Sequence, residues 1–150
     1  IWAVCAVGSA KIRKSIIEKL KKYQNIKFAT LIDPSVIYSK RVKIGEGSII
    51  CAGTIITVDV SIGCHVIINL DCTLGHDDII QDFVTIYPSA NISGNVTVKE
   101  CVELGTGMQA IQGKTIGQES IIGAGAVVVK DIMEKCTAVG NPARIIKYFA

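Results

Sequence analysis

The sequence has few aromatic residues, few charged residues and little leucine. Its 150 residues include 26 Ile and 15 Val but only 5 Leu, and just 5% are aromatic and 19% charged. Helical bundles favour Leu, Ala and Glu, whereas β-branched side chains suit a pleated strand because their χ1 is stiff. With 49% hydrophobic residues, the composition excludes a helical bundle, a disordered chain and a collagen-like chain. We expect one domain, or one domain with a fragment of another.

Long apolar runs and a strong net charge are also missing. The longest apolar runs, such as 123–129, are far shorter than the roughly 18 residues of a membrane span. Residues 1–7 lack the basic lead and cleavage site of a signal peptide. A net charge of +3 is too small to indicate nucleic acid as a partner. The six cysteines form no CxxC motif, so we expect reduced thiols in a cytoplasmic protein without a membrane segment.

A six-residue repeat runs through most of the chain. From Ile32 to Val128 there are 17 successive positions six residues apart, and 15 of them are Ile, Leu or Val. The residue four places further on is usually small or β-branched, with breaks at Asp78, Met108 and Lys114. An amphipathic helix cannot keep this period over such a length, because 3.6 does not divide six. The repeat predicts short strands joined by tight bends, with the aliphatic residue directed into a narrow core.

This repeat resembles that of the hexapeptide-repeat, left-handed parallel β-helix. The resemblance implies triangular coils of three hexads, and residues 31–138 would then form five to six coils. At a spacing of about 4.8 Å the prism would be roughly 27 Å tall. Residues 18 apart would stack directly, and no two cysteines have that separation. The expected fold class is therefore all-β, without a disulfide ladder or a thiolate metal site.

Residues 1–30 depart from the repeat. Residues 1–7 read as a buried strand, Ser9 as a helix N-cap, and residues 25–30 as a second strand. Between them apolar residues recur at helical spacing, and the many Lys and Arg side chains read as a solvated face. This partial βαβ unit resembles the last unit of a Rossmann-like domain. We expect residues 1–30 to be the remnant of a substrate-binding domain whose first half is absent.

Residues 139–150 contain the segment Gly140-Asn141-Pro142-Ala143-Arg144. Pro142 lacks an N–H and should end strand pairing. Directly after a hexapeptide prism, the segment resembles the Gly-x-Pro-Ala-Lys/Arg signature of hexapeptide acyltransferases, in which it lies along coenzyme A. The resemblance implies acetyl-CoA as cosubstrate and Pro142 and Arg144 as coenzyme contacts.

The most informative candidate for chemistry is His76, in the run Gly75-His76-Asp77-Asp78. It follows the inward-facing Leu74 by two places and should lie on the outer surface near a bend. Asp78 breaks the small-residue pattern, and such departures mark functional or strained sites. Imidazole exchanges a proton near neutral pH, and a neighbouring carboxylate can hold the ring. The spacing alone leaves a catalytic histidine and an exposed structural histidine both open.

The whole chain resembles the sugar O-acyl- and N-acetyltransferases that include sialic acid O-acetyltransferases and bacillosamine- and perosamine-type N-acetyltransferases. The shared residues are Lys11–Lys14, Lys27–Thr30, Ile68-Asn69 seven places before His76-Asp77, and the closing segment. The resemblance implies that His76 is the general base, that Asp77 is its partner, and that Asn69 supports the base. It also implies a homotrimer, because in this family the coenzyme lies between two prisms.

The coil length supplies a candidate donor for the oxyanion. Residue 94, one coil after His76, is Gly, so its backbone N–H would lie beside the imidazole. In the resembled group this position contacts the thioester carbonyl. Positions 94, 112 and 130 should stack along one edge. The candidate coenzyme contacts are Gly94, Gln112, Ala124, Lys130, Pro142 and Arg144.

Some features depart from the family pattern or stay ambiguous. Some members carry a second His nine residues after the first, where this chain has Thr85, so any help from that His is in doubt. His65 reads as structural. No Lys or Arg occurs between Lys43 and Lys99, whereas six acidic residues do. An acidic belt around the base would suit a positively charged amino sugar, and a solvated acidic face is an equal interpretation.

These observations predict acetyl-CoA-dependent transfer to an amino or hydroxyl group of a sugar, by direct attack and without a metal. The βαβ unit favours a nucleotide-linked amino sugar. Sialic acid, serine or simple-sugar O-acetylation is the main alternative. A metal enzyme like γ-carbonic anhydrase needs three His ligands, and the chain has two. Three features argue against a catalytically silent scaffold, namely the His-Asp pair, Gly94 and the closing segment.

Overall fold

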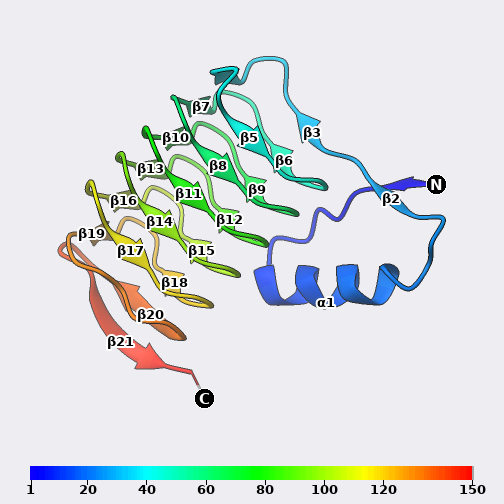
Figure 1. The fold of residues 1–150 in the computed structure, drawn as a ribbon. Coiled ribbons are helices and arrows are strands. Elements are labelled where there is room, and N and C mark those ends of the chain that lie inside the picture. Colours follow the sequence, from blue (N-terminus) through cyan, green and yellow to red (C-terminus); the bar gives the residue numbers. More distant parts are fainter. Residues whose placement is uncertain (150) are drawn as a thin grey trace.

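The computed structural model describes residues 1–149, and most of them form a left-handed parallel β-helix (Figure 1). Three sheets of short strands make the faces of a triangular prism. The eight-stranded face contains β3 (Leu31–Ile32), β6 (Ile49–Ile50), β9 (Ile67–Ile68), β12 (Thr85–Ile86), β15 (Glu103–Leu104), β18 (Ile121–Ile122), β20 (Cys136–Val139) and β21 (Arg144–Tyr148). The six-stranded face contains β4 (Ile37–Tyr38), β7 (Ile55–Ile56), β10 (Thr73–Leu74), β13 (Asn91–Ile92), β16 (Gln109–Ala110) and β19 (Val127–Val128). The five-stranded face contains β5 (Lys43–Ile44), β8 (Ser61–Ile62), β11 (Ile79–Ile80), β14 (Thr97–Val98) and β17 (Thr115–Ile116).

The coils repeat every 18 residues without slippage. Thr73 lies opposite Ile55 on one side and Asn91 on the other, and the other parallel pairs of the prism from β3 to β19 keep the same separation. Six strands stacked on one face make about six coils, which confirms the predicted number. Among the strands of residues 1–149, only β21 runs antiparallel, against β20.

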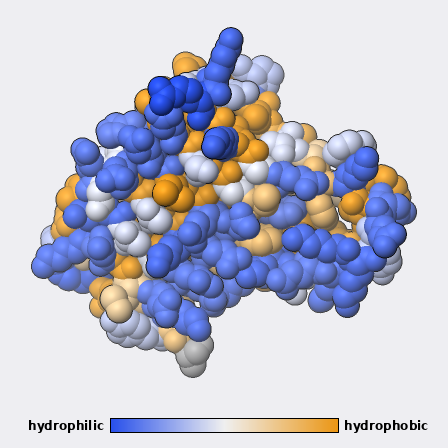
Figure 2. Space-filling view, viewed as in Figure 1, coloured by the Kyte–Doolittle hydropathy of each residue, from blue (hydrophilic) through white to orange (hydrophobic). Residues whose placement is uncertain are grey.

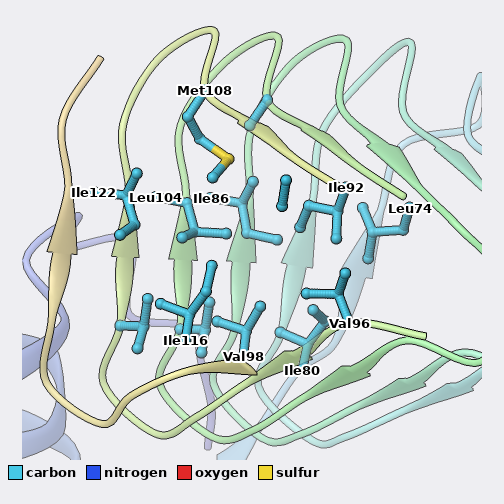
Figure 3. Packing of buried hydrophobic residues seen from close by; sticks show 14 of the residues in the cluster. Leu74, Ile80, Ile86, Ile92, Val96, Val98, Leu104, Met108, Ile116 and Ile122 are labelled. Atoms are coloured by element: carbon cyan, nitrogen blue, oxygen red, sulfur yellow. The ribbon is translucent and has the colours of Figure 1, made fainter. Parts of the chain in front are cut away.

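The core is a stack of aliphatic side chains from the six-residue repeat. Figure 3 shows Leu74, Ile86, Ile92 and Leu104 directed into the space between the faces, and all are buried. Met108, one of the breaks in the small-residue pattern, is also fully buried there. Identical narrow slots hold β-branched side chains well and leave little room for rings, which explains the scarcity of aromatic residues.

The chain turns at three corners of the prism, which we name by their contents. The His76 corner consists of the turns after the six-stranded face, at residues 75–78, 93–96, 111–114 and 129–131. The Asn69 corner consists of the turns after the eight-stranded face, at residues 69–72, 87–90, 105–108 and 123–126. The helix corner consists of the turns after the five-stranded face, at residues 63–66, 81–84, 99–102 and 117–120.

The predicted βαβ unit is present in residues 1–30. It contains β1 (Trp2–Ala3), α1 (Ala10–Leu20) and β2 (Lys27–Phe28), and the two strands pair in parallel. Both strands are shorter than the sequence suggests. Ser9 is the N-cap residue by position, but its side chain makes no capping bond. Instead, the Ala10 N–H donates to the Glu103 carboxylate at 2.9 Å, so the prism itself caps the helix.

The interpretation of the helix cations as a solvated face is wrong for Arg13. Its side chain is 0% exposed and lies between α1 and the helix corner. All five guanidinium N–H groups find backbone carbonyls, those of Val7, Gly8, His65, Phe83 and Val84, at 2.6 to 3.1 Å. Burial lowers the pKa of Arg13. The surface over α1 that faces solvent is still largely hydrophilic (Figure 2).

We expect Arg13→Ala to detach α1 from the prism. The variant loses five hydrogen bonds and leaves buried carbonyls unpaired, so the free energy of unfolding should fall by about 2–4 kcal/mol. Urea denaturation followed by circular dichroism measures the change. The exposed Lys19→Ala is the matched control and should stay within about 0.5 kcal/mol of the original protein. Equal stability of the two variants would contradict the anchoring role.

The six cysteines are all free. Within residues 1–149 no helix has the length and apolar character needed to cross a membrane.

Candidate active site

His76 and Asp77 form a close pair on an outer turn of the prism. Nδ1 of His76 lies 2.7 Å from Oδ2 of Asp77, and their side chains are 52% and 59% exposed. Asp77 adopts a left-handed backbone conformation, with φ of 61°, which Asp tolerates better than most residues. Because a carboxylate only accepts hydrogen bonds, this contact favours the tautomer of the neutral ring that carries its proton on Nδ1 and a lone pair on Nε2.

Gly94 lies against the imidazole from the next coil. A Cβ at this position would come within 2.4 Å of Nε2 of His76, so only glycine leaves room for the ring. Gly75 packs just as tightly, because a Cβ there would lie 2.3 Å from the Gly94 nitrogen. The two glycines therefore bring the backbone of one coil into direct contact with the turn that carries His76.

The backbone N–H of Gly94 is available as a hydrogen-bond donor. It has no acceptor among residues 1–149, whereas the neighbouring Asn95 N–H donates to the His76 carbonyl at 2.7 Å. Like Gly94, Cys64 is the second residue after a strand, at the helix corner. Its N–H donates to the Asp82 carboxylate at 2.7 Å. An N–H at this place can thus hold a negatively charged oxygen, which is what an oxyanion requires.

Two candidate coenzyme contacts meet at the last coil. Lys130 and Arg144 line one surface pocket of about 270 Å³, together with Ala143. Gln112 is exposed in the turn between Gly94 and Lys130 and lies on the same corner. Pro142 follows a cis peptide bond, and Ala143 anchors this segment by donating its N–H to the Val127 carbonyl at 2.8 Å. Lys130 therefore lies three coils from His76 on the same corner, and Arg144 lines the same pocket as Lys130.

Asn69 and Ala124 do not join this group within one chain. Both lie at the Asn69 corner, on the other side of the six-stranded face from His76. Asn69 is half-buried and its carbonyl accepts the Thr54 hydroxyl at 2.9 Å, while Ala124 is exposed. The predicted site residues are thus divided between two corners of the prism.

The remaining polar candidates have structural surroundings. Thr85 is 0% exposed and donates its hydroxyl to the Gly8 carbonyl at 2.6 Å, so it lies under the βαβ unit and away from His76. His65 is buried between Phe28 and Phe83, with ring centroids 4.8 and 5.3 Å away. Burial lowers the pKa of His65. Neither residue has a place in the chemistry at His76.

The acidic stretch does not form one belt around His76. Asp59, Asp77 and Asp78 lie at the His76 corner, where Asp59 pairs with Arg41 at 2.6 Å. Glu46 and Asp82 instead accept backbone N–H groups near the helix corner. The six acids are spread over three corners because a turn occurs every six residues, so their density in the sequence does not measure their density in space.

Two residues near His76 were not predicted as site residues. Gly75 packs on the Ser93–Gly94 peptide, and its signals in the sequence are its place before His76 and the glycine that often follows the aliphatic residue of the hexad. Asp78 is 0% exposed beside the pair, and its signal was the break in the small-residue pattern. The described part of the chain contains no cluster of three or more His, Cys, Asp or Glu side chains that could hold a metal ion.

Known proteins of similar sequence and structure have this architecture. No family model matches the chain. GDP-perosamine N-acetyltransferase of Escherichia coli O157:H7 is 32% identical over 148 residues, which are 95% of this chain and 66% of that protein. A perosamine N-acetyltransferase from Caulobacter crescentus, crystallised with CoA and GDP-perosamine, has a TM-score of 0.94 and 33% identity over 97% of this chain and 69% of that one.

The acetyltransferase domain of PglB from Neisseria gonorrhoeae is similar to the same extent. It has a TM-score of 0.92 and 36% identity over 95% of this chain and 69% of that one. The chain spans about two thirds of the length of each of these three proteins. With this identity over nearly all of its residues, the chain belongs to the hexapeptide-repeat acetyltransferases, in the group of the perosamine-type sugar N-acetyltransferases.

Proposed function

We propose that the protein transfers an acetyl group from acetyl-CoA to the amino group of a nucleotide-linked sugar. The observation that carries the proposal is the place of His76, whose Nδ1 is held by Asp77 while Gly94 lies against the Nε2 side of the ring. The similarity to a perosamine N-acetyltransferase crystallised with CoA and GDP-perosamine supports the class of both substrates.

The reaction would proceed by direct attack. The neutral amine of the sugar adds to the thioester carbonyl, and Nε2 of His76 takes the proton that the nitrogen must lose. Asp77 stabilises the imidazolium, and the Gly94 N–H donates to the oxyanion. When the tetrahedral intermediate collapses, the C–S bond breaks and the imidazolium returns its proton to the departing thiolate. The products are the N-acetylated sugar and CoA.

The active unit would be a homotrimer. One prism contributes His76, Gly94 and Lys130, and its neighbour contributes the Asn69 corner with Ala124. Two facts support this arrangement: the site residues are divided between two corners of one chain, and Ile37 and Ile55 expose 65% and 42% of their surface on the face between these corners. A neighbouring prism would cover those side chains.

Complementation between two inactive variants tests the shared site. His76→Ala removes the base, and Ala124→Glu places a negative charge where coenzyme phosphates would lie. A site that takes one corner from each variant is intact, so random co-assembly of co-expressed chains should restore about a quarter of the original activity. Activity no higher than that of the separate variants would contradict the shared site, as would a fully active monomer in light scattering.

The acceptor class is tested by thiol release from acetyl-CoA. We expect kcat/KM to be highest for GDP-perosamine or a UDP-4-amino sugar, and at least about 100-fold lower for sialic acid and serine, because a site built for one polar group discriminates strongly. A preference for a hydroxyl acceptor would instead identify an O-acetyltransferase, and the absence of thiol release with every acceptor would refute the proposed activity.

The free thiols support a cytoplasmic location, where cysteines stay reduced.

A further inference from the structure

Asp78 is a buried carboxyl group next to the proposed catalytic pair. It is 0% exposed, and its Oδ1 accepts the Val96 N–H at 2.8 Å. Its Oδ2 is also buried and has no hydrogen-bond partner among residues 1–149. A buried carboxylate oxygen without a partner is costly, so this side chain calls for a physical reason.

Asp78 lies four residues after the inward-facing Leu74, and other coils show what this place in the hexad requires. Ser120, at this place, donates to the Gly117 carbonyl three residues before it. Ser48, Thr54 and Cys72 occupy the same place, and each donates to the carbonyl 15 residues ahead. The three acceptors are Gly63, Asn69 and Tyr87, at 2.9, 2.9 and 3.3 Å.

Ser48 shows that one side chain can serve two partners at this place. Besides donating to a carbonyl, it accepts the Val66 N–H, 18 residues ahead, at 3.0 Å. The Val96 N–H is likewise 18 residues ahead of Asp78, so Oδ1 of Asp78 has taken over the accepting role. The donating role remains for Oδ2, and the carbonyl 15 residues ahead of Asp78 is that of Ser93.

We propose that Asp78 is protonated in the folded protein and that its Oδ2 donates a hydrogen bond to the Ser93 carbonyl, which makes Asp78 a positioning residue for the Gly94 N–H. The C=O and N–H of a trans peptide point in opposite directions, so a donor bound to Ser93 fixes where the Gly94 N–H points. A hydrogen bond to the carbonyl also polarises the peptide and strengthens its N–H as a donor. This inference rests on the proposed function.

The surroundings favour the neutral form of Asp78. Burial raises its pKa to about 7, although the backbone groups of Val96 and Gly75 act in the opposite direction. His76 and Asp77 are the charged or titratable groups of its own turn, and they act with opposite sign on this carboxyl. In the coil before it Asp59 is paired with Arg41, and the positions one coil before and after Asp78 are the aliphatic Val60 and Val96.

A melting experiment without substrates tests the protonation. Asp78→Asn keeps both hydrogen bonds in a neutral side chain of the same shape. An acid whose pKa is raised on folding binds its proton more tightly in the folded state, so it loses stability as the pH rises. The Tm of the original protein should therefore fall relative to Asp78→Asn between about pH 4 and about pH 7. A constant difference across this range would show an ionised Asp78 and overturn the proposal.

A kinetic series tests the positioning. Asp78→Asn and Asp78→Ser retain a donor, as at Ser48, and should keep kcat within about threefold, whereas Asp78→Val has none and should lose about tenfold with KM for acetyl-CoA nearly unchanged. The ratio of original to Asp78→Asn kcat should fall as the pH rises through about 7. Ser48→Val, which removes the same pair of hydrogen bonds 30 residues away, is the matched control and should leave kcat unchanged.

The outcomes separate this inference from the proposed function. Equal kcat for Asp78→Val and Asp78→Asn, or equal losses in all three variants, would overturn the positioning role. If Asp78→Val fails to fold, the pH dependence of the Asp78→Asn ratio decides, and a flat ratio overturns it. If no acceptor is acetylated at all, the proposed function fails, while the melting experiment still reports whether Asp78 is protonated.

Discussion

His76→Ala is expected to lower kcat by about 10²–10⁴-fold, the usual contribution of a general base. The side chain is 52% exposed and makes its hydrogen bond to Asp77 alone, so its removal should leave the fold intact. The candidate coenzyme contacts lie on other turns, so the Kd for acetyl-CoA should stay within about twofold. Thiol release under saturating substrates gives kcat, and calorimetric titration of the same variant gives the Kd.

The kcat of His76→Ala tests its role as the base, and the Kd for acetyl-CoA tests whether it binds the coenzyme. An unchanged kcat would place the base at another residue. A large increase in the Kd would show that His76 binds the coenzyme, and the loss of activity would then not report proton transfer. An unchanged Tm of His76→Ala is the control that the variant is folded.

Gly94→Ala should lower kcat by about 10²–10³-fold, comparable to the loss of an oxyanion donor. The new Cβ would meet Nε2 of His76 at 2.4 Å and both ring carbons next to it at 2.7 Å. Either the ring or the Ser93–Gly94 peptide must move, and both movements separate the base from the donor. Steady-state kinetics with saturating acetyl-CoA measures the effect.

Gly113→Ala is the matched control for Gly94→Ala. Gly113 lies one coil further along the same corner, and a Cβ there would meet no atom within 4 Å. Its φ of 73° makes alanine cost about 1–2 kcal/mol of stability. We expect this variant to be less stable but to keep its kcat. Equal losses of kcat in both variants would mean that backbone disturbance at this corner, rather than contact with His76, sets the rate.

The sequence predicts the fold and the contact between His76 and Gly94 because the repeat is arithmetic. A uniform hexad without insertions fixes which residues lie 18 apart, and the observed pairing of Thr73 with Asn91 has that register. The place of Gly94 beside His76 follows directly from it. Packing between distant coils contributes little, since each coil contacts mainly its neighbours.

What the sequence does not predict depends on contacts outside the repeat. The burial of Arg13 and the cap on Ala10 arise where the βαβ unit meets the prism, and no periodicity relates these parts. The spread of the acidic residues over three corners was misjudged because neighbours in sequence are separated by turns. The sequence shows the break at Asp78, but the proposed partner of its Oδ2 is inferred from what Ser48 and Thr54 contact.

The central claim is direct, His76-dependent transfer of an acetyl group to an amino sugar, and mass spectrometry of both reactants tests it most directly. After incubation with acetyl-CoA, a nucleotide-linked amino sugar should gain one acetyl group for each CoA released. The intact mass of the protein should stay unchanged, and His76→Ala should form no detectable product in the same time. An acetylated protein that passes its acetyl group to the sugar, or equal product from His76→Ala, would contradict the account.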